Sequence, residues 1–179
     1  MRRRGIALLV AVLAASFAGA GEPHEPMSVE AILAAINARR ASHSLPPLRD
    51  DFRLREAAED RISDMIELAY WSHESPDGRS PFSWLSLRGY RFARAGENLA
   101  YGFQTPEILV DSWMESPGHR GNILEPGYVD AGVAIIEGST TGRAPGHSIV
   151  MLFGRELIEP ITRRASKDQS RETSEPDRR

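Results

Sequence analysis

The sequence predicts an α+β fold, in which amphipathic helices are followed by a pair of strands. Apolar residues recur at helical spacing over about residues 29–42 and 51–69. Two apolar runs, residues 129–137 and 147–153, are joined by a turn-rich connection, which is typical of a hairpin in an antiparallel sheet. A chain of 179 residues is long enough for one domain with a sizeable core.

The first twenty residues have the pattern of a secretory signal peptide. Three arginines follow Met1, a short apolar stretch runs from Ile6 to Phe17, and Ala18-Gly19-Ala20 offers the small residues that signal peptidase requires. The apolar stretch is short for a membrane span, and an uncleaved anchor is the alternative. We therefore expect residues 1–20 to be a signal peptide and 21–28 a leader. The mature protein would then be secreted, extracellular or periplasmic, with no transmembrane span.

Composition excludes several kinds of site. The chain has no cysteine, so disulfides, thiol catalysis and cysteine-bound metals are ruled out. Its formal net charge is −3 and it has no basic stripe, so nucleic acid is not an expected partner.

The first two helices are separated by a proline-containing break. Ser28 is a good N-cap for the helix over 29–42. The residues 45–48, Leu-Pro-Pro-Leu, end it and favour an extended segment. The helix over about 51–69 follows, and both helices have one apolar face.

Two shorter helices are expected in the middle of the chain. One spans about residues 81–88 and ends at Gly89, which suits a left-handed C-cap. The other begins at Thr105, an N-cap followed by proline, and ends near Glu115 because a proline follows shortly after.

The stretch after Glu115 is the most distinctive in the chain. Ser116-Pro117-Gly118 breaks the helix and predicts a tight turn that presents His119. A surface turn whose histidine caps the preceding helix is the alternative interpretation.

The C-terminal residues 158–179 are predicted to be a disordered charged tail, which leaves 29–157 as the domain. From Ile161 onward, ten of the 19 residues are charged and only Ile161 is large and apolar. Such a segment buries too little apolar surface to become ordered.

Three side chains are the candidates for chemistry. His73 and His119 each follow a helix and lie beside a Ser-Pro pair, and Glu97 stands between glycine and asparagine. Two imidazoles and a carboxylate could hold a divalent metal. They could equally transfer protons, or form a polar network that joins loops.

These residues lie in motifs that resemble the bacterial branch of the CAP superfamily, which includes the cysteine-rich secretory proteins, antigen 5 and pathogenesis-related proteins (SCP-like domains). The motifs are His-Glu-Ser-Pro-Asp-Gly over 73–78, Gly-Glu-Asn-Leu-Ala over 96–100, and Trp113 with Ser-Pro-Gly-His-Arg-Gly-Asn-Ile-Leu over 116–124. The resemblance covers about residues 29–155. It implies an α-β-α sandwich with a small antiparallel sheet between helices, and an extracellular location.

The resemblance also implies a binding cleft. The family's two histidines fall on His73 and His119, and its first glutamate on Glu97. Its second glutamate falls on Ser116, as is common in the bacterial branch, and Glu115 is one residue early. One residue is about 100° of helix rotation, so Glu115 is expected to point elsewhere.

The leading functional hypothesis is a secreted binding module whose cleft takes a divalent cation such as zinc, through His73 and His119 with Glu97 as a possible third ligand. Its partner would be a small hydrophobic ligand, a lipid or a component of the cell envelope. The alternative is a metal-dependent hydrolase or peptidase-like enzyme using the same cleft, and a structural envelope protein is a third interpretation. If Glu97 binds the metal, no general base remains for hydrolysis. The lack of a remaining general base favours binding over catalysis.

Overall fold

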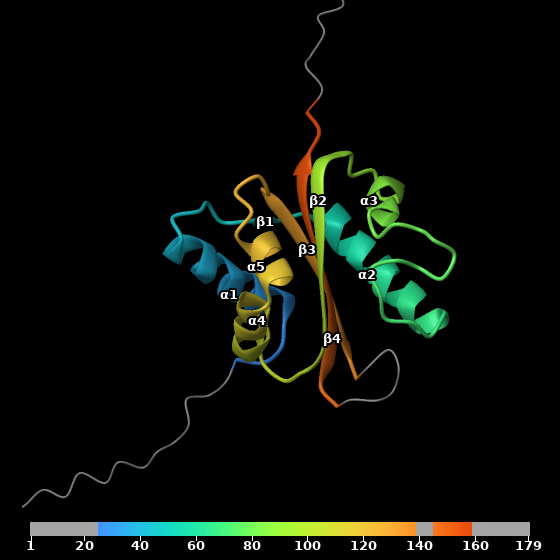
Figure 1. Cartoon of the computed structure of the whole chain (residues 1–179), viewed down its shortest axis with the longest axis horizontal. Coiled ribbons are helices and arrows are strands. Elements are labelled where there is room, and N and C mark those ends of the chain that lie inside the picture. Colours follow the sequence, from blue (N-terminus) through green and yellow to red (C-terminus); the bar gives the residue numbers. More distant parts are fainter. Residues whose placement is uncertain (1–24, 139–144, 159–179) are drawn as a thin grey trace, which may run out of the picture.

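A four-stranded sheet with helices on both faces forms the centre of the fold (Figure 1). The computed structural model describes residues 25–138 and 145–158. Its strands are β1 (Arg49–Asp50), β2 (Phe92–Phe103), β3 (Asp130–Glu137) and β4 (His147–Glu156). Their order is β1-β3-β4-β2, and β4 pairs antiparallel with both β2 and β3. The predicted α+β class and the hairpin are confirmed.

Two features of the sheet differ from the prediction of a small antiparallel sheet. The two-residue strand β1 pairs in parallel with β3, so the sheet is mixed. The long strand β2 was not predicted as a strand. Its sequence, FARAGENLAYGF, contains alanine, glycine, glutamate and asparagine, which have weak strand propensity. Pairing with β4 along nearly its whole length overrides that propensity.

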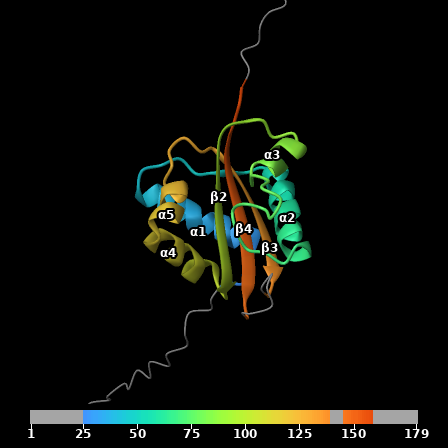
Figure 2. The same cartoon turned by 45° about the vertical axis from the view of Figure 1, so that its right-hand side comes forward.

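The helices form the two outer layers. Helices α1 (Val29–Ser42), α4 (Pro106–Glu115) and α5 (Pro117–Ile123) pack together on one face of the sheet. On the other face lie α2 (Phe52–Glu67) and α3 (Ser83–Leu87), and Figures 1 and 2 show both layers. Within the described residues, no helix is long and apolar enough to cross a membrane.

Side chains of the strands alternate between two apolar cores. On β4, Ile149, Met151 and Phe153 join the core under α1 and α4, whereas Val150 and Leu152 join the core under α2. Because helices cover both faces, the strand is apolar at successive positions rather than at every second one.

The predicted helix ends are mostly confirmed. Ser28 caps α1 and Thr105 caps α4, each through its side-chain oxygen, and Gly89 has a positive φ of 76°. The end of the leader belongs to the fold, since Met27 packs against the α1 core. The predicted signal peptide, the first half of the leader, and all but the first residue of the tail lie outside the described residues.

The predicted tight turn at Ser116–Gly118 is wrong. Only Ser116 leaves the helical conformation, with φ −88° and ψ 118°, and it links the end of α4 directly to the start of α5. Pro117 then occupies the first turn of α5, where a missing backbone N–H does no harm. His119 therefore lies on a short helix.

Candidate functional site

Two of the three predicted site residues are in direct contact. His73, in the loop after α2, has its Nδ1 2.7 Å from Oε1 of Glu97 on β2. The other carboxylate oxygen, Oε2, accepts a hydrogen bond from Nε of Arg61 on α2 at 3.1 Å. Both carboxylate oxygens therefore have protein partners, and the Glu97 side chain is only 2% exposed.

The contact fixes which side of the His73 ring faces solvent. Nδ1–H donates to the carboxylate, and the side chain is 60% exposed. Nε2 makes no hydrogen bond within the described part of the chain, so its lone pair is available to a ligand. The hydrogen bond to Glu97 raises the pKa of His73 and the Glu97 charge adds to this, while partial burial and Arg61 act in the opposite direction.

His119 approaches the same strand from the other face. It lies on α5, and its backbone carbonyl accepts a hydrogen bond from Nδ2 of Asn98 at 3.2 Å. Asn98 follows Glu97 on β2, and neighbouring strand residues point to opposite faces. Burial lowers the pKa of His119, and the charge of His73 lowers it further. Charge on the His73 imidazole thus disfavours protonation of the His119 imidazole.

Two asparagines that were not proposed as site residues join α5 to β2. Nδ2 of Asn122 donates to the Glu97 carbonyl at 3.0 Å and to Oδ1 of Asn98 at 2.8 Å. Gly96 allows this close approach, because a Cβ there would lie 2.4 Å from the Tyr128 hydroxyl and 2.8 Å from Oδ1 of Asn122. Both asparagines fall within the quoted motifs, which was the signal that could have identified them.

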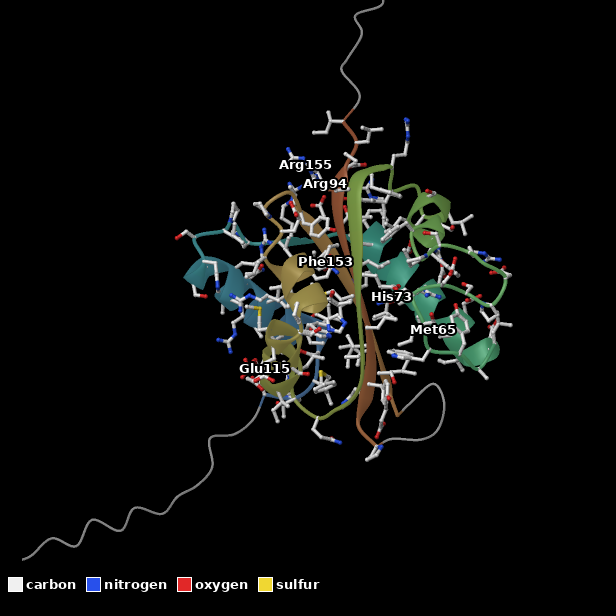
Figure 3. The ribbon with its side chains drawn as sticks, in the orientation of Figure 1. Met65, His73, Arg94, Glu115, Phe153 and Arg155 are labelled. Atoms are coloured by element: carbon white, nitrogen blue, oxygen red, sulfur yellow. The ribbon has the colours of Figure 1, made fainter. Side chains whose placement is uncertain are left out.

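Glu115 takes no part in this arrangement. Its side chain is exposed on α4, and Figure 3 shows it on the opposite side of β2 from His73. It lines a hollow of about 350 Å³ between α1 and α4, together with Arg39, Ser42, His43, Asp111, Met114 and Arg120. Ser116, at the junction of α4 and α5, is half-buried and its side chain does not cap α5.

A scan against protein families matches residues 33–153 to the cysteine-rich secretory protein family, CAP. The chain belongs to the CAP family. Its CAP domain has the family's fold without any cysteine, so no disulfide stabilises it.

Two curated relatives come from Bacillus subtilis strain 168. The uncharacterised protein YkwD is 40% identical over 116 residues, which are 63% of this chain and 45% of YkwD. The uncharacterised membrane protein YlbC is 34% identical over 108 residues, 60% of this chain and 31% of YlbC. The aligned part of this chain spans less than half the length of either relative.

Solved structures have a similar fold. An extracellular SCP-domain protein from Bacillus anthracis superposes with a TM-score of 0.62 at 26% identity, covering 72% of this chain and 40% of that one. An outer surface protein from Borrelia burgdorferi superposes with a TM-score of 0.64 at 19% identity, covering 75% of this chain and 99% of that one. The second likeness shows the fold alone.

Imidazole nitrogens are the donors that this part of the CAP domain could offer to a metal ion. In the described ranges, 25–138 and 145–158, no group of three or more His, Cys, Asp or Glu side chains is arranged to hold a metal ion. Since Arg61 and His73 occupy both oxygens of Glu97, the available donors are Nε2 of His73 and the His119 ring. Glu97 is better placed to orient the His73 ring than to hold a metal ion itself.

Proposed function

We propose that this protein is an exported CAP-domain binding module whose site, formed by His73 and His119, takes a divalent cation. The observation that carries the proposal is the 2.7 Å contact between Nδ1 of His73 and Glu97, which leaves Nε2 facing solvent. Histidines that bind metals usually donate their other ring N–H to a carboxylate or a carbonyl, which fixes the tautomer and orients the ring.

Zinc is the cation that this donor set favours, because neutral imidazoles suit it better than they suit magnesium. His73 and His119 would be the protein ligands, and the remaining positions would be open to water or to an acidic or polar group of a bound partner. A small ligand, a lipid or an envelope component with such a group is the class of partner that the site could hold.

The alternative function is a secreted hydrolase, and one observation favours it. The pKa of His73 is raised and that of His119 is lowered, and such a split pair can divide the roles of acid and base. Against it, Glu97 is committed to two partners and Glu115 faces the opposite side of β2. Neither carboxylate is then left to activate water, so binding is the better-supported function.

Calorimetric zinc titration of the chain lacking residues 1–20 tests the proposal. We expect His73→Ala and His119→Ala each to weaken zinc binding by about tenfold or more, and the double variant to abolish it. His43→Ala is the control, because His43 is an exposed histidine at the end of α1. Binding should also fade below about pH 6, where protons compete for the imidazoles.

Two results would overturn this function. One is zinc binding by the double variant that equals that of the unaltered protein. The other is a loss of binding in His43→Ala while His73→Ala binds zinc as the unaltered protein does, which would place the metal in the hollow between α1 and α4.

Export is the second part of the proposal, and the extracellular location of the Bacillus anthracis protein supports it. N-terminal sequencing of the protein recovered outside the cytoplasm should give a chain that starts near Gly21. Recovery of exported protein that still carries Met1 would contradict cleavage at this site.

A further inference from the structure

Arg61 is a fully buried cation in the middle of α2. Its Nε donates to Oε2 of Glu97 at 3.1 Å, one terminal nitrogen donates to the Tyr70 hydroxyl, and the other donates to the Ser72 carbonyl. The guanidinium also lies over the Trp84 ring, with its carbon 5.0 Å from the ring centroid. Burying a charge is costly, so a cation with this many partners has a specific structural role.

The partners of Arg61 lie on both sides of His73. Ser72 immediately precedes the histidine in the loop, and Glu97 holds its ring from β2. A single guanidinium therefore fixes the backbone that carries His73 and the carboxylate that orients its ring.

The next turn of α2 anchors the rest of the same loop. Asp64, three residues after Arg61, accepts hydrogen bonds from the hydroxyls of Tyr70 and Ser75, and these two hydroxyls lie 2.9 Å apart. The loop is thus tied to α2 before and after His73, while the imidazole itself is mostly exposed.

Lysine could replace the arginine only in part at this position. An ammonium group is a point charge, whereas the planar guanidinium presents donors in several fixed directions. Glu97, Tyr70 and Ser72 lie on different sides of the group, and three separate nitrogens reach them.

We infer that Arg61 is the positioning residue of the histidine site. By holding Glu97 and the Ser72 carbonyl at once, it determines where the His73 ring lies and that Nδ1, rather than Nε2, faces the protein. The inference rests on the proposed function only where metal affinity is concerned, because the ring orientation can be measured without metal.

Nitrogen-15 NMR of the metal-free chain lacking residues 1–20 tests the inference at a pH where His73 is neutral. We expect a single Nδ1–H tautomer in the unaltered protein and a mixture of tautomers in Arg61→Met. Zinc affinity should fall by about tenfold or more in the same variant, as it does when the partners of metal ligands are removed. Arg55→Met is the matched control, because Arg55 is on the same helix but pairs with Asp50 at the surface.

Arg61→Lys is the second variant, chosen because it keeps the charge and most of the packing. It should show an intermediate result, with a minor fraction of the second tautomer and a zinc affinity about threefold or more below that of the unaltered protein. The inference would be overturned if Arg61→Lys, or a folded Arg61→Met, showed the same tautomer and the same zinc affinity as the unaltered protein. If the unaltered protein shows the Nδ1–H tautomer but binds no zinc, the proposed function fails and the positioning role stands.

Discussion

At the scale of single residues, the two histidines differ because they have different neighbours. His73 is mostly exposed and hydrogen-bonded to a buried carboxylate, so its protonated form is favoured. His119 is half-buried near the Trp113 ring, with 6.2 Å between the ring centroids, and burial favours its neutral form.

The pKa shifts of His73 and His119 predict opposite effects of protonation on the stability of the fold in the absence of metal. The raised pKa of His73 means that its contact with Glu97 stabilises the fold fully below the unfolded value of about 6.5, and that this contribution is lost as the pH rises through the folded pKa. The lowered pKa of His119 means that protonating it on acidification opposes folding. The effect at His73 should stay below about 1 kcal/mol, because its imidazole is largely exposed to solvent although Glu97 is buried.

Urea unfolding with a chelator, at about pH 5.5 and pH 9, measures these effects. His73→Gln should lower the free energy of unfolding at the acidic pH more than at the basic pH. His119→Gln should raise it at the acidic pH relative to the unaltered protein. If both variants changed the free energy of unfolding in the same direction at the acidic pH, the opposite pKa shifts of the two histidines would be contradicted.

The histidines and the glutamate of the candidate site were proposed from the sequence, and the resemblance to the CAP family carried that prediction. It did not predict Arg61. An arginine on an amphipathic helix is normally a solvated side chain, and only the loop and strand that pack over α2 bury it. Long-range packing of this kind leaves no mark in the local sequence pattern.

At the scale of secondary structure, helical periodicity and capping residues were reliable. The predicted end of α4 at Glu115 is the observed one, and α1 begins where its Ser28 cap places it. Strand β2 was missed because its stability comes from the partner strand β4, and α5 was missed because a proline and two glycines suggest a turn.

A very close contact between α2 and the sheet is made at Gly132 on β3. A Cβ at this position would lie 2.2 Å from the Arg55 amide nitrogen and 2.2 Å from the Leu54 carbonyl carbon. These are backbone atoms, so α2 as a whole would have to move away from β3. We expect Gly132→Ala to reduce the free energy of unfolding by about 2–3 kcal/mol.

Chemical denaturation of Gly132→Ala beside Gly121→Ala checks this expectation. Gly121 lies in α5, and a Cβ there meets nothing within 4 Å, so alanine should leave stability unchanged or raise it slightly. Equal losses in the two variants would mean that close packing at β3 is not the cause.

At the scale of the whole molecule, the sheet separates two apolar cores and the helices close both. The CAP domain reaches this arrangement with no cysteine, and its sheet ends at Glu156, where Arg53 makes an ion pair with the last strand at 2.6 Å. In the described part of the chain, the residues of both cores come before that point.

Residues beyond Pro160 should therefore be dispensable for folding. A chain truncated after Pro160 should keep its thermal midpoint within about 1–2 °C, because segments outside the core usually change stability by less than ~0.5 kcal/mol. Differential scanning calorimetry of the truncated and the untruncated chain measures the two thermal midpoints. A midpoint lower by about 5 °C or more would show that the tail contributes to the folded domain.

The carbonyls of Glu97 and Leu99 on the edge strand β2 accept hydrogen bonds from the side chains of Asn122 and Trp113. An exposed edge is where sheets of separate molecules join and grow into fibrils. Helices α4 and α5 place their side chains over this edge, and β1, at the opposite edge, is only two residues long. A strand from a neighbouring molecule that paired with this part of β2 would thus have to displace the side chains of Asn122 and Trp113 from the two carbonyls.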